Sequence, residues 1–263
     1  MLLPYRLTLM QRLQDAARND YAFYINGTID RVKWDAFVAK MSGAYETDLP
    51  KSTRSKRRSA GEAVSLLYGC EPPPYADDQR ICWVLVVSAG RGRVHGREQL
   101  LEFAKQRLEL DGYELVHDGV GWSWRMTTKR YHYWRERIHA VAAKRPEKRS
   151  VGEDAEGTFD ADIETVMDAL YNAPGFRLVR RQVGHLVNYA KGEWKRLRPM
   201  TGVQIRPRSF LPYVQRLPNA IKPKASVPLS DMALNDVPPK KPEVTIALFD
   251  QVFTGEVYWD DDE

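Results

Sequence analysis

The segment Ile81-Cys82-Trp83-Val84-Leu85-Val86-Val87 constrains the fold most strongly, because it is a continuous run of β-branched, aromatic and other apolar residues. Such a run is typical of a strand buried on both faces, since a strand with one solvated face alternates apolar and polar residues. We therefore expect the strand 81–87 at the centre of a sheet with other elements on both sides. With 43% hydrophobic residues in 263, the chain can bury such a core.

The spacing of apolar residues predicts further helices and strands around this central strand. The run 21–25 before Asn26-Gly27 is predicted as a short strand ended by a turn. Four helices are predicted, at 3–17, 34–45, 100–108 and 129–144. Two strands, at 112–118 and 121–127, are predicted to form a hairpin with a glycine turn. This order indicates an α+β fold, a small mixed or antiparallel sheet with flanking helices.

Charge and proline content divide the chain into segments. Residues 1–149 form the predicted α+β domain, and residues 150–161, which contain acids and no Lys or Arg, are predicted as an acidic linker. Residues 162–217 are predicted as a basic α-helical hairpin, because two apolar stripes flank Pro174-Gly175. Residues 218–263 start with several prolines and end in acids, which predicts an extended connector and an acidic, aromatic tail.

Composition and spacing exclude several classes of protein and of site. No run approaches the roughly 18 apolar residues of a membrane-spanning helix, and charges appear too early for a secretory signal, so we expect a cytoplasmic protein without a membrane partner. Cys70 and Cys82 lack a CxxC pattern, and the histidines lack metal-binding spacing, so no metal is expected. The loop 90–97 matches neither the dinucleotide fingerprint nor the nucleotide P-loop, so no cofactor is expected.

The helix predicted at 176–198 carries a one-sided charge. Residues 171–224 hold twelve Lys or Arg and one acid, Glu193. On this helix the cations lie opposite the apolar stripe, without the acids that normally alternate with them. A row of cations suits a nucleic-acid backbone, whose neutralisation releases counterions. The predicted phosphate contacts on this helix are Arg177, Arg181, Lys191, Lys195 and Arg198, with His185 and Asn188 on the same face.

Three further segments are basic. KSTRSKRR (51–58) has no apolar anchor and is predicted as a mobile arm. The loop 90–97 lies between a strand and a helix start, where backbone N–H groups favour an anion. Residues 122–149 interleave cations with tyrosines and tryptophans. The candidate phosphate contacts in these segments and in the arm that follows the basic helix are Arg54, Lys56, Arg57, Arg58, Arg91, Arg93, Arg97, Arg125, Lys129, Arg130, Arg137, Arg206 and Arg208.

Aromatic residues accompany the charges in the last quarter of the chain. Phe210 and Tyr213 are predicted either to stack on unpaired bases or to pack as an ordered arm. The tail is predicted to dock on a protein partner or to fold back over the basic groove, unless it completes the core as a final strand. Its candidate docking residues are Phe249, Phe253, Tyr258 and Trp259.

Together, these segments predict a non-enzymatic nucleic-acid-binding protein that grips the phosphate backbone of single-stranded or structured DNA or RNA within a nucleoprotein complex. Two alternatives stay open. The first is a phosphodiester-processing enzyme, of endonuclease or strand-transfer type, in which Tyr131 or Tyr133 is the nucleophile or His95 the base. The second is a structural subunit of a larger assembly, whose basic surfaces are interfaces with other subunits.

Overall fold

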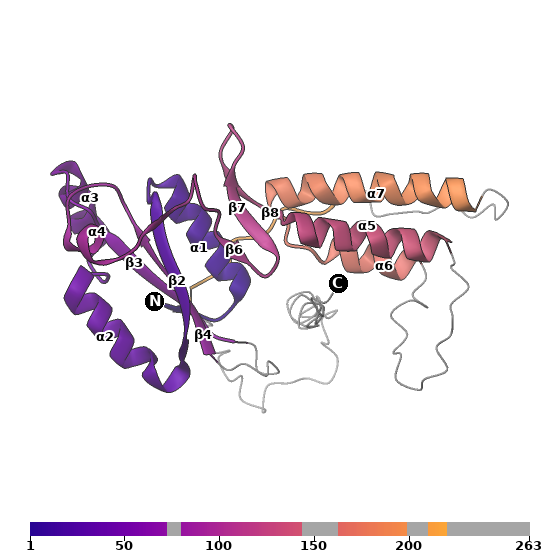
Figure 1. The fold of residues 1–263 in the computed structure, drawn as a ribbon. Coiled ribbons are helices and arrows are strands. Elements are labelled where there is room, and N and C mark those ends of the chain that lie inside the picture. Colours follow the sequence, from indigo (N-terminus) through magenta and orange to yellow (C-terminus); the bar gives the residue numbers. More distant parts are fainter. Residues whose placement is uncertain (73–79, 144–162, 199–209, 220–263) are drawn as a thin grey trace, which may run out of the picture.

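A computed structural model describes residues 1–72, 80–143, 163–198 and 210–219 of the protein. These residues form a mixed α+β fold with a five-stranded mixed sheet and a smaller antiparallel sheet (Figure 1). In spatial order the large sheet contains β1 (Leu2–Leu3), β3 (Ser65–Cys70), β4 (Arg80–Val87), β2 (Phe23–Asp30) and β5 (Leu101–Glu102), with only β1 and β3 parallel. The small sheet contains β6 (Glu109–Leu110), β7 (Tyr113–His117) and β8 (Trp122–Met126).

Strand β4 lies at the centre of the large sheet, which confirms the prediction from its apolar run. Val84 and Val86 belong to a large core that includes the buried face of α1 (Arg6–Arg18). Leu85 and Val87, which alternate with them, belong to a smaller core that includes residues of α2 (Trp34–Tyr45). The strand is therefore covered on both faces, as a strand without polar alternation requires.

Three helices pack together beside the small sheet: α5 (Thr128–Ala143), α6 (Ile163–Tyr171) and α7 (Arg177–Leu197) (Figure 1). Trp134 of α5 and Leu186 of α7 are buried in the same large core that contains α1. Trp124 of β8 joins the two regions, because it is fully buried and its Nε1 donates a hydrogen bond of 2.9 Å to the Met10 carbonyl. The helices and the N-terminal sheet thus share one hydrophobic core.

Residues 210–219, which we call the strap, run in an extended conformation from α7 to α1. At one end, Arg180 of α7 donates through Nε to the Leu211 carbonyl at 2.5 Å. At the other end, the Gln11 side chain on α1 donates to the Gln215 carbonyl at 2.6 Å and accepts from the Leu217 N–H at 3.0 Å. The strap therefore connects the helical layer to the N-terminal part of the fold by hydrogen bonds between its backbone and side chains of α7 and α1.

The turn predicted at Asn26-Gly27 is wrong, because both residues lie inside β2 and pair with β4. Gly27 is paired with Trp83, and a Cβ on Gly27 would lie 2.9 Å from the indole ring. This glycine makes room for an aromatic ring against the sheet and does not reverse the chain.

The helix predicted at 100–108 is also wrong. Leu101 and Glu102 form β5, and the Phe103 N–H donates to the Ala22 carbonyl at 3.0 Å. Leu100 then packs against the smaller core and Leu101 against the larger one, as expected of neighbouring residues in an extended chain. The apolar spacing that resembles a helix here comes from residues that serve two different cores.

Candidate nucleic-acid interface

The exposed face of α7 forms a ridge that consists of Arg181, Gly184, His185, Asn188, Lys191, Gly192 and Lys195. These residues recur at intervals of three and four, so they lie on one side of the helix, opposite the buried stripe. Within the described ranges, the side chains of Arg181, Lys191 and Lys195 form no hydrogen bond and no ion pair. Three positive charges on this face are therefore not neutralised by the described part of the protein.

Glu193, the only acid of α7, points away from the ridge. Its carboxylate accepts a hydrogen bond from Arg196 at 2.8 Å and lies 2.6 Å from Nδ1 of His139 on α5. The hydrogen bond from Arg196, followed by that from His139, lowers the pKa of Glu193 to about 2. The negative charge is thus held between α7 and α5, and the ridge keeps its positive potential.

A groove of about 560 Å³ lies between the ridge and the strap. Arg181, Asn188 and Lys191 line it from α7, and Phe210 lines it from the strap with 63% of its surface exposed. An exposed ring beside unpaired cations is the arrangement on which unpaired bases stack. The structure therefore brings one predicted aromatic residue and three predicted phosphate contacts, Arg177, Arg181 and Lys191, into the same groove.

A second groove, of about 490 Å³, lies on the other side of the ridge, between α7 and the hairpin of β7 and β8. Trp122 and His117 line it, with their ring centroids 5.4 Å apart, together with His185 of the ridge. Arg125 also lines this groove, but its Nε donates to the buried Glu114 at 2.6 Å. Arg181 lines both grooves, so it lies between them.

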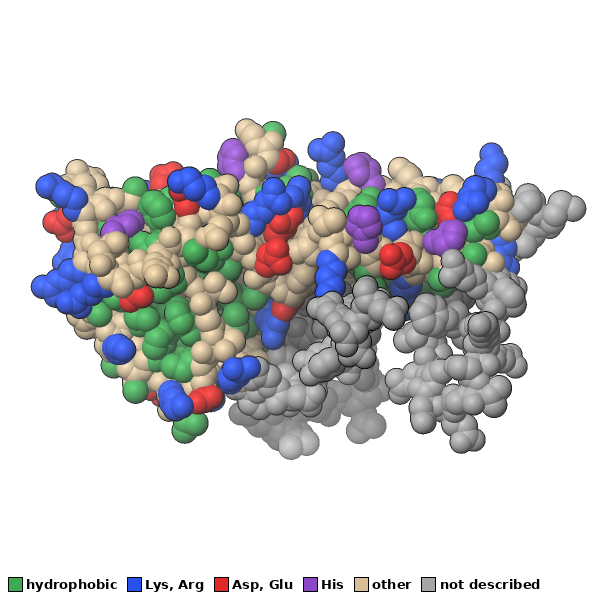
Figure 2. Space-filling model, in the orientation of Figure 1, with side chains coloured by type: hydrophobic (Ala, Val, Ile, Leu, Met, Phe, Trp, Pro, Cys, Tyr) green, Lys and Arg blue, Asp and Glu red, His purple; other side chains and the backbone are tan. Residues whose placement is uncertain are grey.

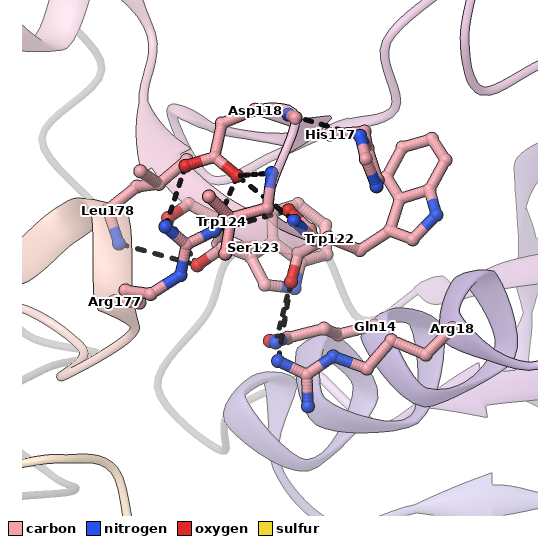
Figure 3. A network of polar contacts seen from close by, with 12 residues as sticks. Gln14, Arg18, His117, Asp118, Trp122, Ser123, Trp124, Arg177 and Leu178 are labelled. Atoms are coloured by element: carbon pink, nitrogen blue, oxygen red, sulfur yellow. Dashed lines mark hydrogen bonds and ion pairs between the residues drawn. The ribbon is translucent and has the colours of Figure 1, made fainter.

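A polar network holds the start of α7 against the β7–β8 hairpin (Figure 3). Arg177 forms two hydrogen bonds with Asp118, at 2.6 and 2.7 Å, and the Leu178 N–H donates to Ser123 Oγ at 3.3 Å. Hydrogen bonding from Arg177 holds the pKa of the Asp118 carboxyl below its usual range. Arg177, predicted as a phosphate contact, is therefore engaged within the protein and fixes the direction of α7.

The remaining predicted cations divide according to their contacts. Those already bonded to side chains or carbonyls are Arg54, Arg57, Arg58, Arg125, Arg130, Arg137 and Arg198. Those for which the described ranges supply no hydrogen bond from the side chain and no ion pair are Lys56, Arg91, Arg93, Arg97 and Lys129, beside the three of the ridge. Outside the described residues lie Arg206, Arg208, Phe249, Phe253, Tyr258 and Trp259, the predicted linker 150–161 and residues 220–263.

The basic segments are distributed along the molecule. α3 (Lys51–Ser59) and α4 (Arg93–Arg97) lie at one end and α7 at the other (Figure 1), and on the face drawn in Figure 2 Lys and Arg side chains lie at both ends and between them. The prediction of a mobile arm at 51–58 is wrong, because these residues form a regular helix. Arg57 anchors that helix to Glu46, and Arg58 lies 3.2 Å from Asp20.

Comparison of the chain with protein-family models, with curated proteins and with solved structures gives no match. In the described part of the chain, no helix combines the length and the apolar character needed to cross a bilayer. Only the geometry and chemistry of the site then point to a function for this chain.

The residues considered for catalysis lie far apart. His95 is on α4, where its Nε2 lies 3.0 Å from the Ser88 carbonyl and its ring packs edge-on against Phe23. Tyr133 is on α5, at the other end of the molecule (Figure 1), and accepts a hydrogen bond of 3.2 Å from Arg137. Among the described residues, no group of three or more His, Cys, Asp or Glu side chains could hold a metal ion.

Arg180 is part of the groove wall, and sequence reasoning missed it. Its guanidinium lies 3.6 Å from the centroid of the Tyr213 ring, and it also donates to the strap. Nothing in the local sequence indicates this contact, because Tyr213 follows 33 residues later in the chain. The preceding Val179 belongs to the buried stripe, so only the position of Arg180 at the edge of that stripe could have suggested a lining role.

Proposed function

We propose that this protein binds single-stranded or structured nucleic acid, with the ridge of α7 against the phosphate backbone. The observation that carries the proposal is the set of three unpaired cations on one exposed helix face that contains no acid. From Arg181 to Lys195 the ridge extends about 21 Å along the helix axis, a length that covers several phosphates.

The grooves beside the ridge favour unpaired bases over a regular duplex. Phe210 exposes its ring in one groove, and Trp122 lines the other. Stacking of a base on an aromatic side chain contributes about 1 to 3 kcal/mol and needs no particular base. A backbone on the ridge could thus place successive bases toward either groove.

The two glycines of the ridge support close contact with a backbone. A Cβ on Gly184 or Gly192 would meet nothing within 4 Å, so packing inside the described protein does not require glycine there. Glycine in a helix interior costs about 1 kcal/mol relative to alanine. Bare backbone beside Arg181 and Lys191 lets a phosphate approach the helix more closely than a side chain would allow.

Fluorescence anisotropy with labelled single-stranded DNA, single-stranded RNA and duplexes, at low and at physiological salt, tests the proposal. We expect wild type to show a steep salt dependence, and the ridge variant Arg181→Ala/Lys191→Ala/Lys195→Ala to lower the slope of log K against log salt by about 2. The matched control is Lys33→Ala/Lys40→Ala/Lys105→Ala, which removes the same charge from exposed sites outside the ridge. Equal losses in the two variants would contradict a specific ridge.

The same titrations distinguish binding from processing. Gel analysis of the nucleic acid after incubation detects the cleavage products or the covalent adduct that the phosphodiester-processing alternative requires. If wild type binds no nucleic acid even at low salt, the structural-subunit alternative becomes the better explanation. Docking of a protein partner on the tail and a cytoplasmic location stay predictions from the sequence.

A further inference from the structure

Helix α3 differs from an ordinary surface helix, because none of its residues is buried. The positions with the spacing of a core-facing stripe are Lys51, Arg54, Ser55, Arg58 and Ser59. Instead of packing on the sheet, these five side chains line one wall of a cavity of about 650 Å³. A helix face that is normally apolar is here cationic and rich in hydroxyl groups, and it faces open space.

The opposite wall of the cavity is formed by α1 and β3 and supplies aromatic surface. Tyr21, Leu66 and Tyr68 line it, with Tyr21 and Tyr68 almost fully buried. The Tyr68 residue is only 9% exposed, and its hydroxyl forms no hydrogen bond with any described residue. Burial raises the pKa of Tyr68 to about 12, so this hydroxyl is neutral and can donate to an anion in the cavity.

The charge of Lys51 is available to a ligand, and those of Arg54 and Arg58 are only partly engaged within the protein. Lys51 has no ion pair within the described ranges, and Arg54 donates a hydrogen bond of 2.5 Å to the Leu49 carbonyl. Arg58 lies 5.6 Å from the centroid of the Tyr21 ring and is paired at 3.2 Å with Asp20, whose side chain is 87% exposed and so binds it weakly. The one carboxylate in the wall, Asp15, is itself paired with Arg216 at 2.5 Å. The wall therefore carries excess positive charge.

We propose that this cavity, the phosphate pocket, binds a phosphomonoester. Such a group carries about two negative charges and three acceptor oxygens. Lys51, Arg54 and Arg58 supply the cations, Tyr68 supplies a neutral donor, and the ring of Tyr21 supplies a surface for the group attached to the phosphate. The phosphate could belong to a free nucleotide or to the 5′ end of a nucleic-acid chain. The inference does not depend on the ridge, which lies at the other end of the molecule.

Isothermal titration of the full chain with adenosine 5′-monophosphate, adenosine and inorganic phosphate tests the pocket. We expect the nucleotide to bind and adenosine to give no signal. Tyr68→Phe removes one donor and should weaken nucleotide binding about tenfold. Lys51→Ala should weaken it about threefold, whereas Lys40→Ala, which removes the same charge from an exposed position on α2 outside the cavity lining, should leave it unchanged. Circular dichroism of each variant verifies folding.

Three results would overturn the proposal: no binding of the nucleotide by folded wild type, equal binding of adenosine, or equal losses in Lys51→Ala and Lys40→Ala. A second comparison, of 5′-phosphorylated with 5′-hydroxyl oligonucleotides, identifies the source of the phosphate. If the phosphorylated oligonucleotide binds more tightly and Tyr68→Phe removes this difference, the pocket binds the 5′ end of a chain. If only the mononucleotide binds in the pocket, the ligand is a free nucleotide. The ridge variant should bind the mononucleotide as tightly as wild type does. The proposal for the ridge and the proposal for the phosphate pocket can therefore fail independently of each other.

Discussion

Glu193 contributes to α7 in two ways, through its charge and through its partners. Arg196 and His139 hold its carboxylate at the α5 side of the helix, which leaves no negative charge on the ridge. Its pKa in the folded protein, about 2, lies below the ordinary value of 4.5. A carboxyl with a lowered pKa stabilises the folded state above pH 4.5, and this stabilisation is lost as the pH falls from 4.5 toward 2.

We therefore expect Glu193→Gln to lower the free energy of unfolding by about 1 kcal/mol at neutral pH. The difference from wild type should shrink below pH 4.5, because wild type loses the same interaction on protonation. Urea denaturation at several pH values measures it. Glu136→Gln, an exposed carboxyl on α5 without a partner in the described part of the chain, is the control and should show no such trend. A constant difference at all pH values would argue against the pairing.

At the scale of one element, α7 combines a continuous buried stripe with two glycines that no packing within the described residues requires. Gly184→Ala/Gly192→Ala should raise the free energy of unfolding by roughly 1 to 2 kcal/mol, because alanine favours the helix. On the proposed function, the same variant should bind nucleic acid more weakly, since two methyl groups would keep the backbone away. Denaturation midpoints and anisotropy measure the two effects.

Gly43 in α2 provides a matched control, because it is also exposed and helical, and a Cβ added to it would meet no described atom within 4 Å. Gly43→Ala should increase stability by about 1 kcal/mol and leave binding unchanged. If both variants affect binding equally, the ridge glycines have no special role in contact with the ligand.

Long segments of regular spacing could be predicted from the sequence, and contacts between distant residues could not. The stripes of α5 and α7 and the apolar run of β4 are local patterns, and the structure confirms them. The sequence pattern did not predict the helix α3, because this helix has no apolar stripe. Ion pairs with Glu46 and Asp20 hold it against the rest of the fold instead. The groove beside α7 was predicted only in part, because its second wall, the strap, comes from a segment without periodicity.

At the scale of the whole molecule, the large core runs from α1 through Trp124 to α7, so we expect the described regions to unfold together. Gly175 lies where the strap crosses the start of α7, and a Cβ there would clash with the carbonyl oxygen of Pro212. Gly175→Ala should therefore destabilise the protein by about 2 kcal/mol or more. Coincident urea transitions by tryptophan fluorescence and circular dichroism check cooperativity, and two separated transitions would contradict it.

The strap also couples the groove to a remote part of the fold. Phe210 borders the groove beside α7, while the Leu217 N–H, at the other end of the same segment, is bonded to Gln11 on α1. A ligand that holds Phe210 in place reduces the openings through which the Leu217 amide exchanges with solvent. Slower hydrogen–deuterium exchange at Leu217 would then report occupancy of a groove that Leu217 itself does not line.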